Sequence, residues 1–185
     1  MSQTPLISVG IPVFNSEKTI RRCLDAIASQ TYQNIEIIIS DNNSTDGTYG
    51  ICERYASSDK RITLYRQEEN KGIVANFKFV FQKSKGKYFF WAAGDDFWER
   101  QFVEYLQNAL AKTPNAVAAH CEVLRIFPDG WQHDCISFKG KTNITRLSTF
   151  QLLYLLLSSK TRIRNLKYNL FINGLICRNA LDEVV

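Results

Sequence analysis

The adjacent carboxylates Asp95 and Asp96 are the residues of this sequence that point most directly to chemistry. They stand shortly after the aromatic run Tyr88–Ala92, and two neighbouring carboxylates repel each other unless a cation or hydrogen-bond donors neutralise them. Cations such as Mg²⁺ commonly take one or two protein carboxylates and draw their remaining ligands from phosphate and water. We therefore predict a Mn²⁺ or Mg²⁺ site at Asp95 and Asp96. The alternative is that the pair caps a helix starting at Arg100.

Three more polar segments follow apolar runs in the same way: Pro12–Asn15, Asp41–Ser44 and Asn70–Gly72. Taken singly, each segment could be no more than a turn or a helix cap. In open α/β sheets, however, ligands bind beyond the carboxyl ends of the strands. If the apolar runs are parallel strands, these segments and the acidic pair meet at one edge of the sheet. Together they favour a metal-assisted site for a nucleotide phosphate.

The elements that must position these segments alternate between strand and helix. The expected strands are continuous apolar runs at Leu6–Val13, Ile35–Ser40, Ile62–Tyr65, Tyr88–Ala92 and Ala116–Leu124. The expected helices follow Ser16, Thr45 or Asp46, and Gly72, and a fourth spans Arg100–Ala111. This order predicts an α/β fold with a mostly parallel central sheet and helices on both faces.

The alternation weakens after Arg125. There we expect strands at Trp131–Phe138 and Phe171–Cys177, and a helix at Thr149–Ser159.

Several other kinds of site are disfavoured. The sequence has no G-x-G-x-x-G after its first strand and no G-x-x-x-x-G-K-[ST], which argues against a dinucleotide site and a P-loop. Neither His120 nor His133 has a companion at metal-ligand spacing. The five cysteines are scattered and form no C-x-x-C pair, so we expect reduced thiols and neither a disulfide framework nor a zinc site.

Length and composition predict one ordinary globular domain. The chain has 185 residues, of which 45% are hydrophobic and 22% are charged. No apolar run approaches the roughly 18 residues that a membrane helix needs, and the N-terminus does not resemble a secretory signal. We therefore expect a cytoplasmic protein.

The net charge of +5 is unevenly distributed. Residues 1–134 carry 15 Lys and Arg against 16 Asp and Glu, whereas residues 135–185 carry 8 against 2. The segment 135–181 has no acidic residue and could meet a phosphorylated or lipid-linked acceptor, or the inner face of a membrane as a peripheral contact. A solvated face is the plainer interpretation. We expect no nucleic-acid partner, because the aromatic residues of this segment are mixed with leucines, which indicates core packing more than base stacking. The alternative, a nucleic-acid-binding protein driven by this segment, predicts a steep salt dependence of binding to RNA or DNA.

Four stretches closely resemble family 2 glycosyltransferases with a GT-A fold, a Rossmann-like nucleotide-binding sandwich. They are ISVGIPVFN at 7–15, IIISDNNSTDGT at 37–48, NKGIVAN at 70–76 and AAGDDFW at 92–98, and their order and spacing match as well. The resemblance implies an inverting enzyme that transfers a sugar from a nucleotide-diphosphate sugar to a hydroxyl of a glycan or lipid-linked acceptor, with a divalent cation.

The resemblance also implies roles for individual residues. Pro12, Phe14 and Asn15 would border the base and ribose, and Asp41 would accept the base N–H, usually that of uracil, which favours a UDP-sugar. The segment with Asn70, Gly72 and Asn76 would border the donor. Asp95 and Asp96 would hold the ribose and the cation.

Two departures from the family pattern matter. The first position of the D-x-D-D motif is Ala93. The general base that an inverting transferase needs lies, in the family, downstream of a segment like 173–178, where this chain offers only Asp182 and Glu183. We therefore expect a donor-binding half at 1–125, an incomplete acceptor-side half at 126–185, and a chain that lacks its general base as part of a longer enzyme. The alternative function is a non-catalytic nucleotide-binding or interaction module on the same fold.

Overall fold

Strands and helices alternate along most of the described chain, as the apolar runs predict. The computed structural model describes residues 4–114, 116–120, 123–126, 132–136 and 174–182. The elements are β1 (Ile7–Val13), α1 (Ile20–Ala28), β2 (Ile35–Asp41), α2 (Thr48–Ser58), β3 (Ile62–Arg66), α3 (Ile73–Lys83), β4 (Tyr88–Trp91), α4 (Phe102–Lys112), β5 (Ala118–His120), β6 (Val123–Ile126), β7 (Gln132–Ile136), β8 (Gly174–Cys177) and α7 (Arg178–Asp182).

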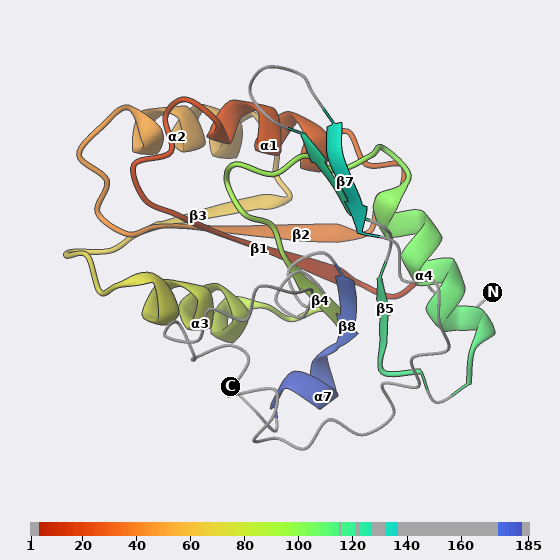
Figure 1. Ribbon diagram of the computed structural model, residues 1–185. Coiled ribbons are helices and arrows are strands. Elements are labelled where there is room, and N and C mark those ends of the chain that lie inside the picture. The colour runs from red at the N-terminus through yellow and green to blue at the C-terminus, as the bar shows by residue number, and fades with distance from the viewer. Residues whose placement is uncertain (1–3, 115, 121–122, 127–131, 137–173, 183–185) are drawn as a thin grey trace.

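Six of the strands form one mixed sheet in the order β3-β2-β1-β4-β8-β5 (Figure 1). The strands β1 to β4 are parallel wherever they pair, and β8 runs antiparallel to both β4 and β5. The β1–β2 register pairs Val13 with Asp41, so both strands end at the same level. The α/β class and the largely parallel sheet are therefore confirmed, and the polar segments after β1 and β2 leave the sheet side by side.

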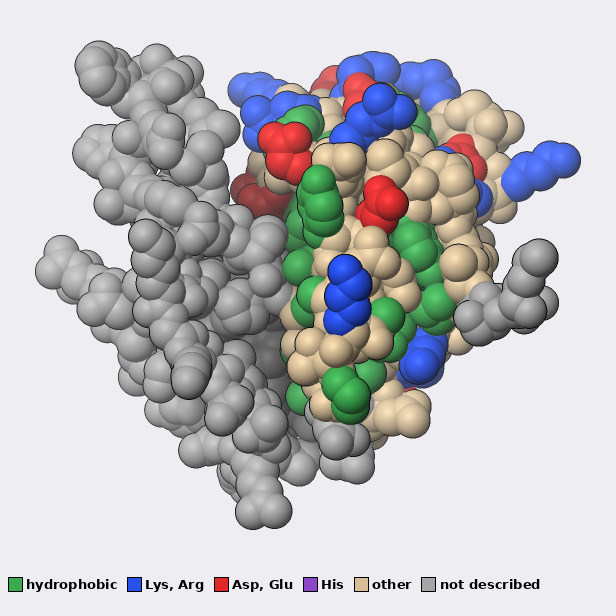
Figure 2. Space-filling view, turned by 90° about the vertical axis from the view of Figure 1, so that its right-hand side faces the viewer, with side chains coloured by type: hydrophobic (Ala, Val, Ile, Leu, Met, Phe, Trp, Pro, Cys, Tyr) green, Lys and Arg blue, Asp and Glu red, His purple; other side chains and the backbone are tan. Residues whose placement is uncertain are grey.

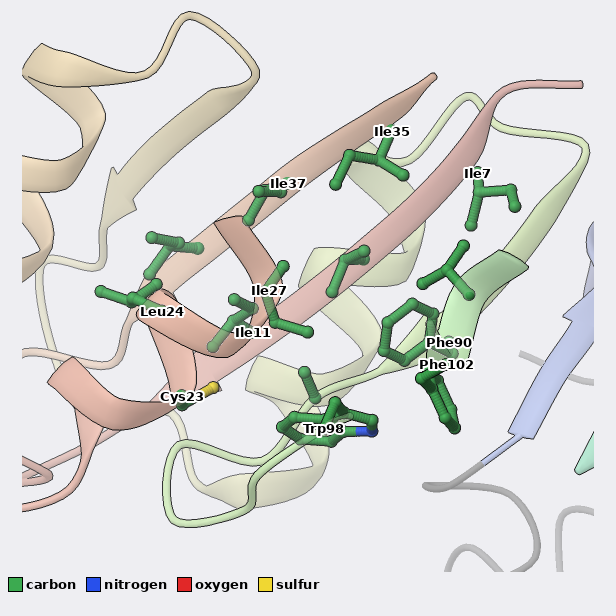
Figure 3. Packing of buried hydrophobic residues seen from close by; sticks show 14 of the residues in the cluster. Ile7, Ile11, Cys23, Leu24, Ile27, Ile35, Ile37, Phe90, Trp98 and Phe102 are labelled. Carbon is green, nitrogen blue, oxygen red and sulfur yellow. The ribbon is translucent and has the colours of Figure 1, made fainter. Parts of the chain in front are cut away.

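Helices cover both faces of this sheet (Figure 1). On one face, α1, α2 and α4 enclose the larger hydrophobic cluster, in which Ile27, Phe90 and Phe102 meet (Figure 3). On the other face, α3 and α7 pack over a smaller cluster that contains Val80 and Phe89. Because successive strand residues face opposite sides, continuous apolar runs are what such a two-sided core requires.

Gly10 in the middle of β1 allows the second face to pack closely. A Cβ at this position would lie 2.6 Å from the Phe89 ring and 2.7 Å from the Val80 side chain. Only a residue without a side chain lets α3 and the β4 aromatic ring approach β1 this closely.

Two sequence-based expectations about local structure are wrong. The single strand expected at Ala116–Leu124 is instead the short strand β5 and a separate strand β6, which leaves the main sheet and pairs antiparallel with β7. The Ser16 side chain does not cap α1, because its hydroxyl donates to the Phe14 carbonyl at 3.2 Å and the helix begins only at Ile20.

The later elements are confirmed in part. Strands β7 and β8 lie inside the ranges expected at Trp131–Phe138 and Phe171–Cys177. The helix expected at Thr149–Ser159 lies outside the described residues. The division into halves at residue 125 stays a prediction.

The described surface mixes both signs of charge. On the face shown in Figure 2, Lys and Arg side chains and Asp and Glu side chains gather along the same upper edge, and the hydrophobic side chains are dispersed. Among the helices that the structure describes, none is long and apolar enough to cross a membrane.

Candidate functional site

A cleft of about 940 Å³ lies at the carboxyl end of the parallel strands. Its walls come from the ends of β1 and β4, the loop after β2 and the start of α3. The lining residues are Pro12, Val13, Phe14, Asn15, Ser16, Glu17, Lys18, Thr19, Asn42, Asp46, Asn70, Gly72, Ile73, Asn76, Phe77, Ala93, Gly94 and Asp95. The structure thus brings the four polar segments of the sequence to one cleft.

Asn15 ties the loop after β1 to the loop after β2. Its Oδ1 accepts the Thr45 backbone N–H at 2.9 Å, and its own backbone N–H donates to Ser44 Oγ at 2.9 Å. Asn15 has a φ of 49°, a left-handed conformation that asparagine tolerates better than most residues. The residue type therefore serves both the backbone turn and the bond across the cleft wall.

A second set of bonds extends this connection into α2. The Ser16 N–H donates to Thr48 Oγ1 at 2.7 Å, and the Glu17 N–H donates to Asp46 Oδ2 at 3.2 Å. Asp46 Oδ1 accepts the Thr48 N–H at 3.0 Å, so Asp46 serves the start of α2, as the sequence predicts. In return, Glu17 Oε2 accepts the Gly47 N–H at 3.0 Å. The two loops therefore form one hydrogen-bonded unit.

Asn42 joins the loop after β2 to the loop before α3. Its Nδ2 donates to Asn70 Oδ1 at 2.8 Å and to the Gly72 carbonyl at 3.3 Å, and its Oδ1 accepts the Lys71 N–H at 3.0 Å. Asn70 Oδ1 also accepts the Gly72 N–H at 2.9 Å. Gly72 has a φ of 83°, which favours glycine at this entry to α3.

Asn76 on α3 reaches across to the ends of β1 and β2. Its Nδ2 donates to the Val13 carbonyl at 3.3 Å and to the Ser40 carbonyl at 3.0 Å, which fixes the orientation of the amide. The Asn76 side chain is buried, and its Oδ1 has no hydrogen-bond partner among the described residues. A buried acceptor left this way at a cleft is a candidate contact for a ligand donor group.

Only one of the two carboxylate oxygens of Asp41, at the end of β2, has a polar partner among the described residues. Its Oδ2 accepts the Ser44 N–H at 3.2 Å and lies 3.6 Å from Arg66 Nε. The Arg66 guanidinium in turn stacks over the Tyr49 ring at 4.5 Å. Asp41 is fully buried, and its Oδ1 has no partner within the part of the chain that the structure describes.

Asp95 and Asp96 occupy different environments. Asp95 is exposed and lines the cleft, and its backbone carbonyl accepts a hydrogen bond from Arg22 Nη2 at 3.1 Å. Asp96 is half-buried and does not line the cleft. Burial and then the Asp95 charge raise the pKa of Asp96 to about 6, against the opposing effect of the Arg22 charge.

The residues at this edge of the cleft suit a hard divalent cation. No hydrogen bond or ion pair engages the Asp95 carboxylate in the described ranges, so its oxygens are available as ligands of the type that Mg²⁺ and Mn²⁺ prefer. The described residues contain no group of three His, Cys, Asp or Glu that could enclose a metal. A cation here would therefore take further ligands from a diphosphate and water.

The cleft gathers most of the residues predicted for the site. Seven of them line it: Pro12, Phe14, Asn15, Asn70, Gly72, Asn76 and Asp95. Asp41 and Asp96 do not. Asp182, one of the two late acidic residues, does not line the cleft either and lies 3.5 Å from Arg178 as an ion pair.

The sequence did not single out Asn42, which lines the cleft, or Arg66, which lies beside the Asp41 carboxylate. Asn42 belongs to a quartet, Asp41–Ser44, whose members all have ordinary turn chemistry, so nothing in the sequence separates it from Asn43. Arg66 ends a strand whose expected boundary was Tyr65. In both cases the deciding contact joins residues more than 20 positions apart.

Comparisons of sequence agree with this geometry. The family model described as Glycosyl transferase family 2 matches residues 8–183. Glycosyltransferase GlyA of Streptococcus pneumoniae is 38% identical over 106 residues, which cover 57% of this chain and 15% of the relative. Glycosyltransferase GlyG of the same species is 39% identical over 102 residues, covering 55% and 34%. The chain thus spans about a third or less of the length of these relatives.

Solved structures show the same fold. The mannosyltransferase PcManGT from Pyrobaculum calidifontis, in complex with GDP-Man and Mn²⁺, matches with a TM-score of 0.58 and 26% identity over 67% of this chain and 37% of that one. TarS 1–349 from S. aureus, in complex with UDP-GlcNAc, matches with a TM-score of 0.51 and 26% identity over 57% and 30%. The fold, the cleft and these comparisons agree, and the chain belongs to glycosyl transferase family 2.

Proposed function

We propose that this chain is the donor-binding part of an inverting glycosyltransferase that takes a sugar from a nucleotide-diphosphate sugar. The observation that carries the proposal is the cleft at the carboxyl ends of β1, β2 and β4, with the unengaged carboxylate of Asp95 on its edge. The complexes of PcManGT with GDP-Man and Mn²⁺ and of TarS with UDP-GlcNAc support this type of ligand and cation. Inversion at the anomeric carbon rests on the family resemblance.

The β1 and β2 side of the cleft would receive the nucleoside. Phe14, which is 42% exposed, offers an aromatic surface there. Asp41 Oδ1 would accept a ring N–H, which uracil and guanine provide and cytosine does not. The side chain is fully buried, so the base would have to displace the covering atoms to reach it. This acceptor disfavours a CDP-sugar, and the family resemblance favours a UDP-sugar.

Asp95 would hold the cation, either Mn²⁺ or Mg²⁺, beside the diphosphate. When bound, the cation would neutralise the charge that develops on the departing diphosphate. Arg22 fixes the backbone at Asp95 through its carbonyl. Asn76 Oδ1, which has no partner among the described residues, would accept a hydroxyl or N–H of the donor. These residues bind and orient the donor, and an acceptor hydroxyl would still need a general base, which we do not assign.

A thermal-shift panel would test the proposal. UDP, GDP, dTDP and CDP are each added with and without Mn²⁺ to the wild type, to Asp95→Asn and to Glu53→Gln, an exposed carboxylate on α2 as control. Ligand at 100 times its Kd should stabilise the fold by about 2.7 kcal/mol. We expect UDP to give the largest shift with Mn²⁺, CDP to give none, Asp95→Asn to lose the Mn²⁺ dependence, and Glu53→Gln to behave as wild type.

Two other outcomes would contradict the proposal. A UDP shift that is the same with and without Mn²⁺, and unchanged in Asp95→Asn, would favour the non-catalytic nucleotide-binding module. If none of the four nucleotides raises the melting temperature, the proposed donor site is excluded.

The acceptor is a separate proposal. A glycan or lipid-linked acceptor, and a peripheral membrane contact through 135–181, depend on a basic segment most of which lies outside the described residues. Reversing the charge of Lys160, Arg162, Arg164 and Lys167 together should weaken binding to anionic vesicles if the segment makes that contact. Unchanged vesicle binding would rule it out.

A further inference from the structure

We propose that Gln30 is a positioning residue that sets the location of the loop carrying Asp95. Gln30 follows α1 and is 1% exposed, yet it has no place in the predicted site and does not line the cleft. This inference rests on the proposed function, because the loop matters only if Asp95 serves a cation.

The Gln30 amide makes three hydrogen bonds, one back to α1 and two to the segment after the loop. Its Nε2 donates to the Ala26 carbonyl at 3.1 Å and to the Glu99 carbonyl at 2.8 Å. Its Oε1 accepts the Val103 N–H at 3.0 Å. The first-turn N–H groups of a helix lack partners within the helix, and α4 has no side-chain cap of its own at Gln101. Gln30 therefore supplies from α1 the cap that α4 lacks.

The neighbours of Gln30 strengthen the same junction. The Thr31 N–H donates to the Arg100 carbonyl at 2.9 Å, and Arg100 Nε donates to the Ser29 carbonyl at 3.3 Å. Thr31 Oγ1 also donates to Glu104 Oε2 at 2.6 Å. The turn after α1 and the start of α4 are thus joined at several points, with Gln30 as the buried member.

The loop with Asp95 spans the gap between two fixed points. On one side, the Ala92 N–H donates to the Gly10 carbonyl at 2.9 Å and anchors the loop to β1. On the other side, the Gln30 junction begins at Glu99. Between them Trp98 is buried against Phe90 and Phe102, as Figure 3 shows. Moving the second anchor would therefore move Asp95, although Gln30 touches neither the loop tip nor a ligand.

Residues that hydrogen-bond directly to a metal ligand commonly change the metal affinity by 10- to 100-fold when they are replaced. Gln30 acts on Asp95 only through the loop, so we expect an effect at the lower end of this range. The test compares Gln30→Met with Glu36→Met as a matched control, since each substitution removes three hydrogen bonds of one side chain. Glu36 Oε1 accepts bonds from Ser8 Oγ, the Lys85 N–H and the Gly86 N–H at the amino end of β2, away from the cleft. Gln30→Asn, which keeps a neutral amide but places it one methylene short of its partners, replaces Gln30→Met if that variant does not fold.

Two readouts are needed: hydrogen exchange at residues 93–101, and the ratio of UDP affinities measured with and without Mn²⁺. Gln30→Met should speed exchange at 93–101 and lower the affinity ratio about tenfold. Glu36→Met should lower the melting temperature while leaving both readouts as in the wild type.

The outcomes separate the two proposals. Unchanged exchange at 93–101 in the Gln30 variant, or equal changes in the Glu36 control, would overturn the positioning role. A wild type whose UDP affinity does not depend on Mn²⁺ would overturn the proposed function, and hydrogen exchange would then still decide whether Gln30 fixes the loop.

Discussion

The two sides of the cleft are held in different ways. On the β1 and β2 side, the loops at 14–19 and 42–48 are bonded to each other through Asn15, Glu17 and Asp46. On the β4 side, the described residues 93–98 make one backbone hydrogen bond among themselves, from the Asp96 N–H to the Ala93 carbonyl at 3.1 Å. Its other contacts are with surrounding elements: the Ala92 N–H bond to β1, the packing of Trp98, and the bond from Arg22 to the Asp95 carbonyl. The junction at Gln30 holds the segment that follows the loop.

This difference suits the two halves of the proposed ligand. A nucleoside is recognised by fixed polar groups, and a wall built from reciprocal bonds is preorganised for that purpose. A cation with few protein ligands needs one available carboxylate and room for phosphate and water. The cleft thus combines a rigid side with a side whose geometry is set by more distant residues.

The largest expected effect comes from breaking the rigid side at Asn42. Asn42→Ala removes the three hydrogen bonds by which the buried Asn42 side chain holds the loop at Asn70 and Gly72. We expect the free energy of unfolding to fall by about 2–3 kcal/mol, because each hydrogen bond contributes about 1 kcal/mol. Urea denaturation measures this change. Asn34→Ala, at an exposed asparagine whose Nδ2 donates to the Thr4 carbonyl, is the control and should cost far less.

A smaller loss of stability should follow from substitutions at Asn15. Two variants separate the contribution of its side-chain hydrogen bond from that of its backbone conformation. Asn15→Ala loses the bond to Thr45 and places alanine at a φ of 49°, whereas Asn15→Gly loses the bond alone. We expect destabilisation of about 1–2 kcal/mol for alanine and about half of that for glycine. Melting temperatures of the two variants give the comparison. Equal losses would mean that the backbone conformation contributes little.

The smallest effect should come from an ion pair away from both sides of the cleft. Bidentate hydrogen bonds from Arg61 hold the pKa of Asp59 below its ordinary value. Because the pKa is lowered in the folded state, the stabilisation is present above the ordinary pKa of about 4 and is lost as the pH falls below it. Asp59→Asn should therefore cost up to about 1 kcal/mol at neutral pH, and the difference should vanish in acid.

Stability curves of wild type and Asp59→Asn between neutral pH and about pH 2 test this prediction. Nucleotide affinity should not change in Asp59→Asn, because Asp59 and Arg61 lie outside the cleft lining. A lower affinity would show that the turn between α2 and β3 affects nucleotide binding, although neither Asp59 nor Arg61 lines the cleft.

The sequence predicts most of the sheet because its strands are buried on both faces. The runs at Leu6–Val13 and Ile35–Ser40 match β1 and β2 to within one residue. The cleft was also predictable, since parallel strands end at one edge and the polar segments follow those ends. The pattern of apolar residues along the chain is enough to predict an element whose structure is decided by burial alone.

What escaped prediction depends on contacts between distant residues. Asp95 and Asp96 are neighbours of identical type, yet only Asp95 lines the cleft, because their environments are set by α1 and by burial. Gln30 resembles any polar residue after a helix until its bonds to Glu99 and Val103 are known. The split of the expected strand at Ala116–Leu124 likewise depends on β8, which comes more than 50 residues later.

The position of β8 between β4 and β5 has a consequence for the order of assembly during synthesis. Within the described sheet β5 pairs only with β8, so β5 cannot join the sheet until the ribosome has made residues 174–177. Strands β1 to β4 can pair as soon as Trp91 has emerged, because they need no later strand. The cleft can therefore form on a nascent chain once its lining residues up to Asp95 have also emerged, while β4 still exposes an unpaired edge. Such edges are prone to misassociation during this interval.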